Sequence, residues 1–296
     1  MVTTLRPVAP GAGTDLHPLI LDPLLESWLR EDWAWGDLTT RTVVPADCTC
    51  RATLLLKQEG VVAGLPVVAR LLTLVDPQLT FTPLVTEGDA LEAGTELARI
   101  EGPAGSLMMA ERLALNLMQR MSAIATLTRL HVEAVTGTHA QILDTRKTTP
   151  GLRLLEKYAV RVGGGRNHRY ALADAIMIKD NHLAIAGSIA EAVQRARAGA
   201  AATTRIEVEV EDLLMLEEAI AAGADLVMLD NMGLEVMREA VRIAAGRVLL
   251  EASGGITLAR VRAVAETGVD FISVGALTHS AGSLDISLDV EETTLG

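Results

Sequence analysis

The chain has 296 residues and a formal net charge of −12. Hydrophobic residues make up 49% and charged residues 22%, a balance typical of a globular protein and not of a disordered one. The negative charge argues against binding to nucleic acid or to an anionic membrane. Because only 2% of the residues are aromatic, the core must be built from Ala, Val, Leu, Ile and Met.

The N-terminal segment 1–19 carries Pro and Gly where a signal peptide would need an apolar run, so we expect a flexible leader. No stretch of the chain approaches the roughly 20 apolar residues that span a bilayer. Cys48 and Cys50 are the only cysteines, and two sulfurs cannot complete a zinc site. We expect ordinary thiols and a cytoplasmic protein.

The first part of the chain predicts a small α+β domain. Residues 20–30 have a helical pattern and lead to a turn at 35–37. Residues 50–105 form short β-like segments punctuated by Gly, which is typical of hairpins. Residues 106–135 then repeat apolar side chains every three or four positions, which predicts one long helix.

From about residue 140 onward the pattern changes, and short apolar runs alternate with helix-like segments. Continuous apolar runs are typical of parallel strands that are buried on both faces, as in βα units. Such units form either an open doubly wound sheet or a barrel. The runs are QILDT (141–145), AIMIK (175–179), RIEVEV (205–210), DLVMLD (225–230), RVLLEA (247–252) and DFISVG (270–275).

The carboxyl ends of these runs favour the barrel. In an open sheet the ligand groups gather at one switch point, whereas in a barrel every strand ends at the same mouth. Each of the six runs ends at charged, amide or hydroxyl residues or at glycine, which are residue types that take part in catalysis or bind phosphate. A regular barrel has eight strands, so we expect one that is short or irregularly closed.

The basic residues are concentrated in one window, 146–179. It holds eight Lys or Arg and two acids, a local charge of +6, so the rest of the chain carries −18. Uneven charge of this kind indicates an anion site. For Arg153, Lys157 and Arg161 a solvated helix face with i,i+4 pairing is the alternative.

The cations at the strand ends have no routine structural use, and they predict anion binding by Arg146, Lys147 and Lys179. The segment GGGRNHRY (163–170) adds three glycines before Arg166, His168 and Arg169. Glycine lets the backbone approach a ligand, and the Arg fork suits carboxylates and phosphates.

Two carboxylates end adjacent predicted strands, at Glu209 and Asp230. They could face a developing positive charge, as in an oxocarbenium-like transition state. The alternative is a structural ion pair with Lys147 or Lys179. A third possibility is that either lysine forms a Schiff base with the substrate, which would require a desolvated amine with a lowered pKa.

Small residues end the last two predicted strands and expose backbone N–H groups. In barrels the late strands often form a phosphate site of this kind, although ordinary turns are the alternative. The residues are Ser253, Gly254, Gly255, Gly275 and Ala276.

Long ordered motifs resemble the quinolinate phosphoribosyltransferase family over roughly residues 20–290. The longest is DTRKTTPGLRLLEKYAVRVGGGRNHRYALADAIMIKDNH (144–182). One departure is Ala123, where the family usually has Gly. The shorter motifs are WGDLTT (35–40), ERLALN (111–116), VEVE (208–211), LDNM (229–232), EASGGI (251–256) and VGALTHSA (274–281).

The resemblance implies a small N-terminal α/β sandwich domain, residues 20–118, and an incomplete α/β (TIM-like) barrel, residues 119–282. It implies that the tail 283–296 packs on the first domain. Family members are homodimers or hexamers in which the first domain of one subunit covers the barrel mouth of its neighbour.

The resemblance also implies a reaction of NAD biosynthesis, in which quinolinate and phosphoribosyl pyrophosphate give nicotinate mononucleotide, pyrophosphate and CO2. It assigns catalysis to Lys147, Glu209 and Asp230, with Mg2+ held by the last two largely through substrate. It assigns quinolinate binding to Arg146, His168, Arg169 and Lys179, with Arg112 from the neighbouring subunit. It assigns phosphoribosyl pyrophosphate to Lys147, Lys179, Glu209, Asp230, Ser253, Gly254, Gly255, Gly275 and Ala276.

Three rival functions remain at this point. A relative that uses nicotinate would need fewer cations than Arg112, Arg169 and Lys179 supply. A Schiff-base aldolase would use Lys147 or Lys179 covalently. A noncatalytic anion-binding protein would share the cations but release no CO2.

Overall fold

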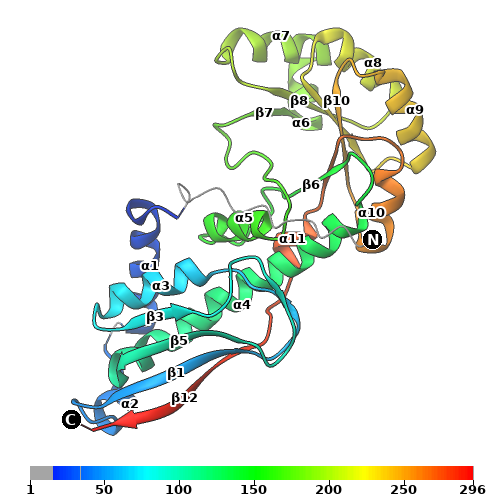
Figure 1. The fold of residues 1–296 in the computed structure, drawn as a ribbon. Helices are drawn as coiled ribbons and strands as arrows, with labels where there is room; N and C mark the ends of the chain where they lie inside the picture. The colour runs from blue at the N-terminus through cyan, green and yellow to red at the C-terminus, as the bar shows by residue number, and fades with distance from the viewer. Residues whose placement is uncertain (1–15, 34, 296) are drawn as a thin grey trace. The chain divides into compact units, whose positions relative to one another are not determined.

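A computed structural model describes residues 16–33 and 35–295. The chain forms two compact units (Figure 1). Unit 1 contains the described residues up to Arg129, together with Thr149–Gly164 and those from Ser280 onward; unit 2 contains Leu130–Thr148 and Gly165–His279. Most of the predicted leader, 1–19, lies outside the described residues, and α1 begins at Pro18.

Unit 1 is built on an antiparallel sheet with the strand order β12-β1-β5-β3. The C-terminal segment pairs with β1 along its length, Ile286 opposite Leu56 and Thr294 opposite Thr49. The tail therefore lies in the sheet of unit 1. The strands are β1 (Thr49–Leu56), β3 (Thr80–Pro83), β5 (Glu96–Pro103) and β12 (Ile286–Thr294), and β2 (Gly60–Val61) pairs separately with β4 (Ala90–Leu91).

The helices of unit 1 supply an aliphatic core. Figure 1 shows α1, α3 and α4 on one side of the sheet. Leu54 and Leu56 of β1, Leu71 of α3 and Met118 of α4 are at most 1% exposed, as the scarcity of aromatic residues requires. The helices are α1 (Pro18–Trp33), α2 (Leu38–Val43), α3 (Leu65–Val75), α4 (Ala104–Ala134) and α5 (Arg153–Val162).

Helix α5 buries charge instead of presenting it to water. Glu156 and Lys157 are 0% and 1% exposed, so the interpretation of Lys157 as part of a solvated face was wrong. The Glu156 carboxylate accepts hydrogen bonds from Arg120 Nη2 at 2.8 Å and from the Thr149 backbone N–H at 3.0 Å. These partners compensate the loss of hydration that a buried carboxylate suffers.

Unit 2 contains one parallel sheet of six strands in the order β6-β11-β10-β9-β8-β7. All six predicted strands are present. Between β6 and β7, the two edges of this sheet, no pairing occurs in the described part of the chain, so the barrel is incomplete, as expected. The strands are β6 (Gln141–Leu143), β7 (Ile176–Ile178), β8 (Ile206–Val210), β9 (Leu226–Asp230), β10 (Leu249–Ser253) and β11 (Phe271–Ser273).

Helices follow the strands of unit 2 in turn, which is the βα alternation predicted from the sequence. Register places Ser253 beside Asp230 and Glu209 beside Met228, so neighbouring strands end side by side. The helices are α6 (Asp180–Ala186), α7 (Ile189–Gly199), α8 (Leu213–Ala222), α9 (Leu234–Ala244), α10 (Leu258–Ala265) and α11 (Ala276–His279). Among the described helices, none combines the length and apolarity needed to cross a membrane.

Candidate active site

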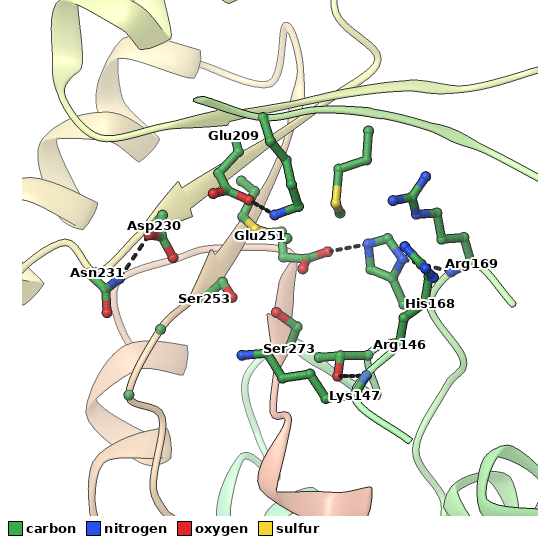
Figure 2. Close-up of a pocket in the computed structure, with 16 residues that line it drawn as sticks. Arg146, Lys147, His168, Arg169, Glu209, Asp230, Asn231, Glu251, Ser253 and Ser273 are labelled. Carbon is green, nitrogen blue, oxygen red and sulfur yellow. Dashed lines mark hydrogen bonds and ion pairs between the residues drawn. The ribbon is translucent and has the colours of Figure 1, made fainter. Parts of the chain in front are cut away.

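A cavity of about 630 Å³ opens at the carboxyl ends of the strands in unit 2 (Figure 2). Of the predicted site residues, the cavity is lined by Arg146, Lys147, His168, Arg169, Lys179, Glu209, Asp230, Ser253, Gly254 and Gly255. Gly275 and Ala276 lie at the turn from β11 into α11 and do not line it. Arg112 is exposed on α4, in unit 1.

A buried aspartate positions the loop that carries His168 and Arg169. Asp144, 0% exposed, directly follows β6 and accepts hydrogen bonds from the His168 backbone N–H at 2.9 Å and from Asn167 Nδ2 at 2.5 Å. Arg166 forms an isolated parallel bridge with Leu143, so the loop runs alongside β6 at this point. This role of Asp144 could not be predicted from the sequence, because it depends on the loop returning to β6.

One wall of the cavity is cationic. Burial first, and then the neighbouring Arg146 guanidinium, lower the pKa of Arg169. Its Nη1 donates to the Ala175 carbonyl at 3.0 Å. Lys147 is held through its backbone, whose N–H donates to Thr145 Oγ1 at 3.0 Å and whose carbonyl accepts from Thr278 Oγ1 at 2.8 Å. These contacts leave the Lys147 side chain to line the cavity.

The opposite wall carries the two predicted carboxylates. Glu209 lies near the end of β8 and is paired with Lys179, while Asp230 ends β9 and accepts a hydrogen bond from Asn231 Nδ2 at 2.8 Å. Both carboxylates face a cavity that is also lined by cations (Figure 2). The Lys179–Glu209 pair shows that part of this charge is compensated within the chain itself.

The turn after β10 favours glycine at two positions, Gly254 because it has no space for a side chain and Gly255 because its backbone is left-handed. A Cβ at Gly254 would lie 2.2 Å from Asn231 Oδ1, and φ is +90° at Gly254 and +57° at Gly255. Asn231 itself has a left-handed φ of 55° and donates its N–H to the Ser253 carbonyl at 2.9 Å. The turn thus brings backbone to the cavity wall without side chains, which suits an anionic ligand.

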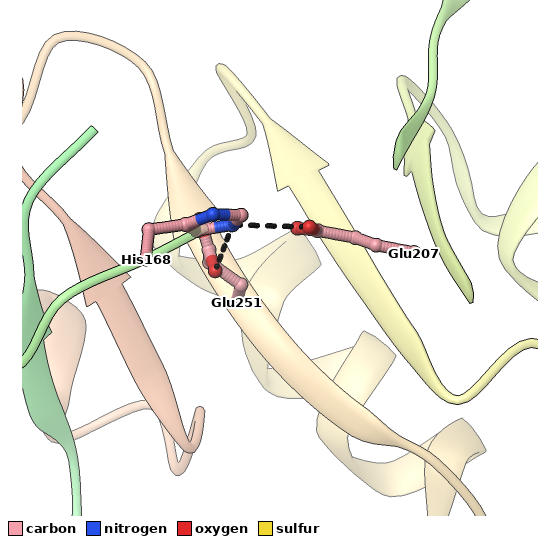
Figure 3. Close-up of side chains that lie close together, drawn as sticks. All are labelled: His168, Glu207 and Glu251. Atoms are coloured by element: carbon pink, nitrogen blue, oxygen red, sulfur yellow. Dashed lines mark ion pairs between the residues drawn. The ribbon is translucent and has the colours of Figure 1, made fainter. Parts of the chain in front are cut away.

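Three side chains meet in the floor of the cavity in an arrangement that the sequence did not predict (Figure 3). His168 Nε2 lies 3.0 Å from Glu207 Oε2 and 3.5 Å from Glu251 Oε2. Glu207 and Glu251 are 3% and 0% exposed.

The buried carboxyl group of Glu251 resists ionisation. Burial, and next the nearby Glu207 carboxylate, raise the pKa of Glu251 to about 8. His168, Ser273 and Lys179 also face this group and oppose the shift without cancelling it. Glu251 is therefore protonated at neutral pH.

Comparison with known families covers both parts of the chain. Residues 37–122 match the description "Quinolinate phosphoribosyl transferase, N-terminal domain", and residues 124–289 match "Quinolinate phosphoribosyl transferase, C-terminal domain". The chain belongs to the quinolinate phosphoribosyltransferase family. The family predicted from the sequence motifs is thereby confirmed.

Individual members of the quinolinate phosphoribosyltransferase family are similar to this chain over most of its length. A probable nicotinate-nucleotide pyrophosphorylase (carboxylating) of Bacillus subtilis is 46% identical, over 93% of this chain and 95% of its own length. A quinolinate phosphoribosyltransferase (decarboxylating) of Nicotiana tabacum is 40% identical, over 86% and 78%. The crystal structure of NadC from Streptococcus pyogenes is 45% identical and superimposes with a TM-score of 0.90, covering 95% of this chain and 99% of that one.

The protonation of Glu251 predicts a pH-dependent stability. Because its pKa is higher in the folded than in the unfolded chain, the stability of the wild type should fall as pH rises from the ordinary value of 4.5 to about 8. Glu251→Gln cannot ionise and should escape this loss. Calorimetry from pH 5 to 9 should therefore show the melting temperature of the wild type falling relative to that of the variant. A constant difference would contradict a protonated Glu251.

Proposed function

We propose that the chain transfers the phosphoribosyl group of phosphoribosyl pyrophosphate to the ring nitrogen of quinolinate and releases pyrophosphate and CO2, giving nicotinate mononucleotide for NAD biosynthesis. The observation that carries this proposal is a single cavity with a cationic wall, a carboxylate wall and a glycine turn. The names of the relatives support the same reaction.

The cationic wall suits the dicarboxylate substrate. We assign quinolinate to Arg146, His168, Arg169 and Lys179, because guanidinium groups bind carboxylates through two parallel hydrogen bonds. Lys147 is assigned to the region between the carboxylates and the departing pyrophosphate. Its ammonium group would offset the negative charge that grows on the leaving group.

The carboxylate wall suits the ribose. As the bond from C1 of the ribose to pyrophosphate breaks, positive charge develops on the ring, and Glu209 and Asp230 would stabilise it. The electron pair of the quinolinate nitrogen then forms the new bond to C1. No covalent intermediate with the enzyme is required, so neither Lys147 nor Lys179 needs to act as a Schiff base.

Mg2+ fits the donor set of this wall. Carboxylate oxygens are its preferred ligands, and Mg2+ is usually held by one or two of them together with substrate phosphates. Glu209 and Asp230 would hold the ion, which supplies charge neutralisation for the pyrophosphate. We assign the 5′-phosphate to Ser253, Gly254 and Gly255 on the cavity wall, and to Gly275 and Ala276 at the neighbouring turn.

We propose a homodimer or a higher oligomer, such as a hexamer, in a cytoplasmic location. Arg112 is exposed on α4 and does not line the cavity of unit 2. This fits a role for Arg112 in binding quinolinate in the active site of a neighbouring subunit. Cys48 and Cys50 are free and buried, which fits a reducing compartment.

The proposed reaction predicts that CO2 is released from carboxyl-labelled quinolinate only when phosphoribosyl pyrophosphate and Mg2+ are present. Radiolabelled CO2 trapped from the purified enzyme measures it. Release without phosphoribosyl pyrophosphate, or none from folded protein with both present, would contradict the assignment.

The shared site predicts complementation between two inactive variants. In a mixed dimer of Arg112→Ala and Lys147→Ala, one site has the intact Lys147 of one subunit and the intact Arg112 of the other. Random mixing should then restore about a quarter of the wild-type activity. Activity that stays at the level of the separate variants, in dimers verified as mixed, would place Arg112 outside the neighbour's site.

A further inference from the structure

The reaction requires one step for which the assigned residues provide no group. When the carboxylate on C2 of the quinolinate ring leaves as CO2, the electron pair of the broken C–C bond stays on C2. Nicotinate mononucleotide has hydrogen at that carbon, so a proton must be delivered to C2. This inference rests on the proposed function and concerns the source of the proton.

The floor of the cavity holds a group that must be a neutral acid. Glu207 and Glu251 are both buried and both lie within 3.5 Å of the same imidazole nitrogen. Two desolvated carboxylates in one site do not ionise together unless cations compensate them. At neutral pH one of the two therefore keeps its proton.

The imidazole does not supply enough positive charge for both carboxylates. His168 Nε2 lies 3.0 Å from Glu207 Oε2 and 3.5 Å from Glu251 Oε2. Burial, and next the Glu207 carboxylate, raise the pKa of Glu251 more than His168 and Lys179 lower it. Glu251, the carboxyl group farther from the imidazole, therefore retains the acidic proton.

Glu251 is also the member of this pair that borders the substrate cavity. It lines both the cavity of about 630 Å³ and a smaller cavity of about 200 Å³, whereas of these two cavities Glu207 lines only the smaller one. Figure 2 shows Glu251 between the carboxylate wall and His168. Glu251 therefore lies at the part of the cavity between the two walls.

The other groups on the wall are less suited to give a proton. Arginine does not lose one in proteins, and Lys179 is paired with Glu209. Glu209 and Asp230 must be ionised to face the ribose. Lys147 is the remaining side chain that could donate a proton. The experiment below distinguishes proton transfer from Lys147 from proton transfer from Glu251.

We propose that Glu251 is the general acid that protonates C2 of the pyridine ring as CO2 departs. The bond from C2 to the carboxyl carbon breaks, its electron pair takes the proton of the Glu251 carboxyl group, and a C2–H bond forms. Glu251 is left as a carboxylate and regains a proton from solvent. The step consumes one proton and releases one CO2, with no oxidant or reductant.

The test is Glu251→Gln, which keeps the shape of the side chain and removes the acidic proton. General acids contribute about 10²–10⁴-fold, so kcat for nicotinate mononucleotide should fall at least about 100-fold. KM should fall with it, because decarboxylation then becomes slower than the transfer that precedes it. Formation of the glycosidic bond should survive. Rapid mixing should therefore show a burst of pyrophosphate equal to the active sites, followed by slow CO2 release and accumulation of the dicarboxylate mononucleotide.

The comparison variant is Glu207→Gln, the same substitution in the same cluster but away from the substrate cavity. Because the Glu207 carboxylate raises the pKa of Glu251, its removal should lower that pKa. CO2 release should therefore stay coupled to pyrophosphate release at pH values where Glu251 keeps its proton and should lag at higher pH, whereas in Glu251→Gln it should lag at every pH. Glu251→Asp retains an acid and should recover activity relative to Glu251→Gln, which keeps the test decisive even if the glutamine variant folds poorly. Aspartate no more active than glutamine, coupled release in Glu251→Gln, or wild-type rates would overturn the proposal and point to Lys147 or solvent. Absence of CO2 release by the wild type would instead refute the proposed function.

Discussion

A parallel strand buried on both faces can carry a charged side chain at low cost only where its carboxyl end leaves the core. The strand ends of unit 2 follow this constraint, because the charged Asp230 ends β9, beside Ser253 at the end of β10, and both residues line the same cavity. The arrangement gathers groups that are far apart in the sequence without any local motif. The site is a consequence of the sheet order as much as of the residues themselves.

The charged side chains that line the cavity partly compensate one another, and this determines which of them can bind substrate. Lys179 and Glu209, at the ends of the neighbouring strands β7 and β8, form an ion pair, while burial and then the nearby Arg146 guanidinium disfavour the charged form of Arg169. A dicarboxylate and a pyrophosphate would reduce the repulsion among these cations, so part of the binding energy would come from that reduction. Glu207 and Glu251 break the strand-end rule, since they lie inside the strands, and a retained proton on Glu251 is the least costly way to bury both.

Much of the fold could be predicted from the sequence, because its signals are local. Continuous apolar runs identified all six strands of unit 2, and three- and four-residue spacing identified α4. Ten predicted site residues line the cavity because strand ends can be read from the same runs. The roles of Asp144 and Glu251 could not be predicted, because each depends on a loop or strand that arrives from elsewhere in the chain. Burial of Lys157 was missed for the same reason.

The central claim is that the cationic wall recognises two carboxylates, and discrimination against a monocarboxylate tests it most directly. Hydrogen bonds to charged groups contribute about 1.5–3 kcal/mol each, so two lost contacts should reduce kcat/KM at least about 100-fold. Steady-state nucleotide formation from phosphoribosyl pyrophosphate should be compared for quinolinate and nicotinate under identical conditions. We expect quinolinate to be favoured by at least that factor. Equal or higher kcat/KM for nicotinate would contradict the account.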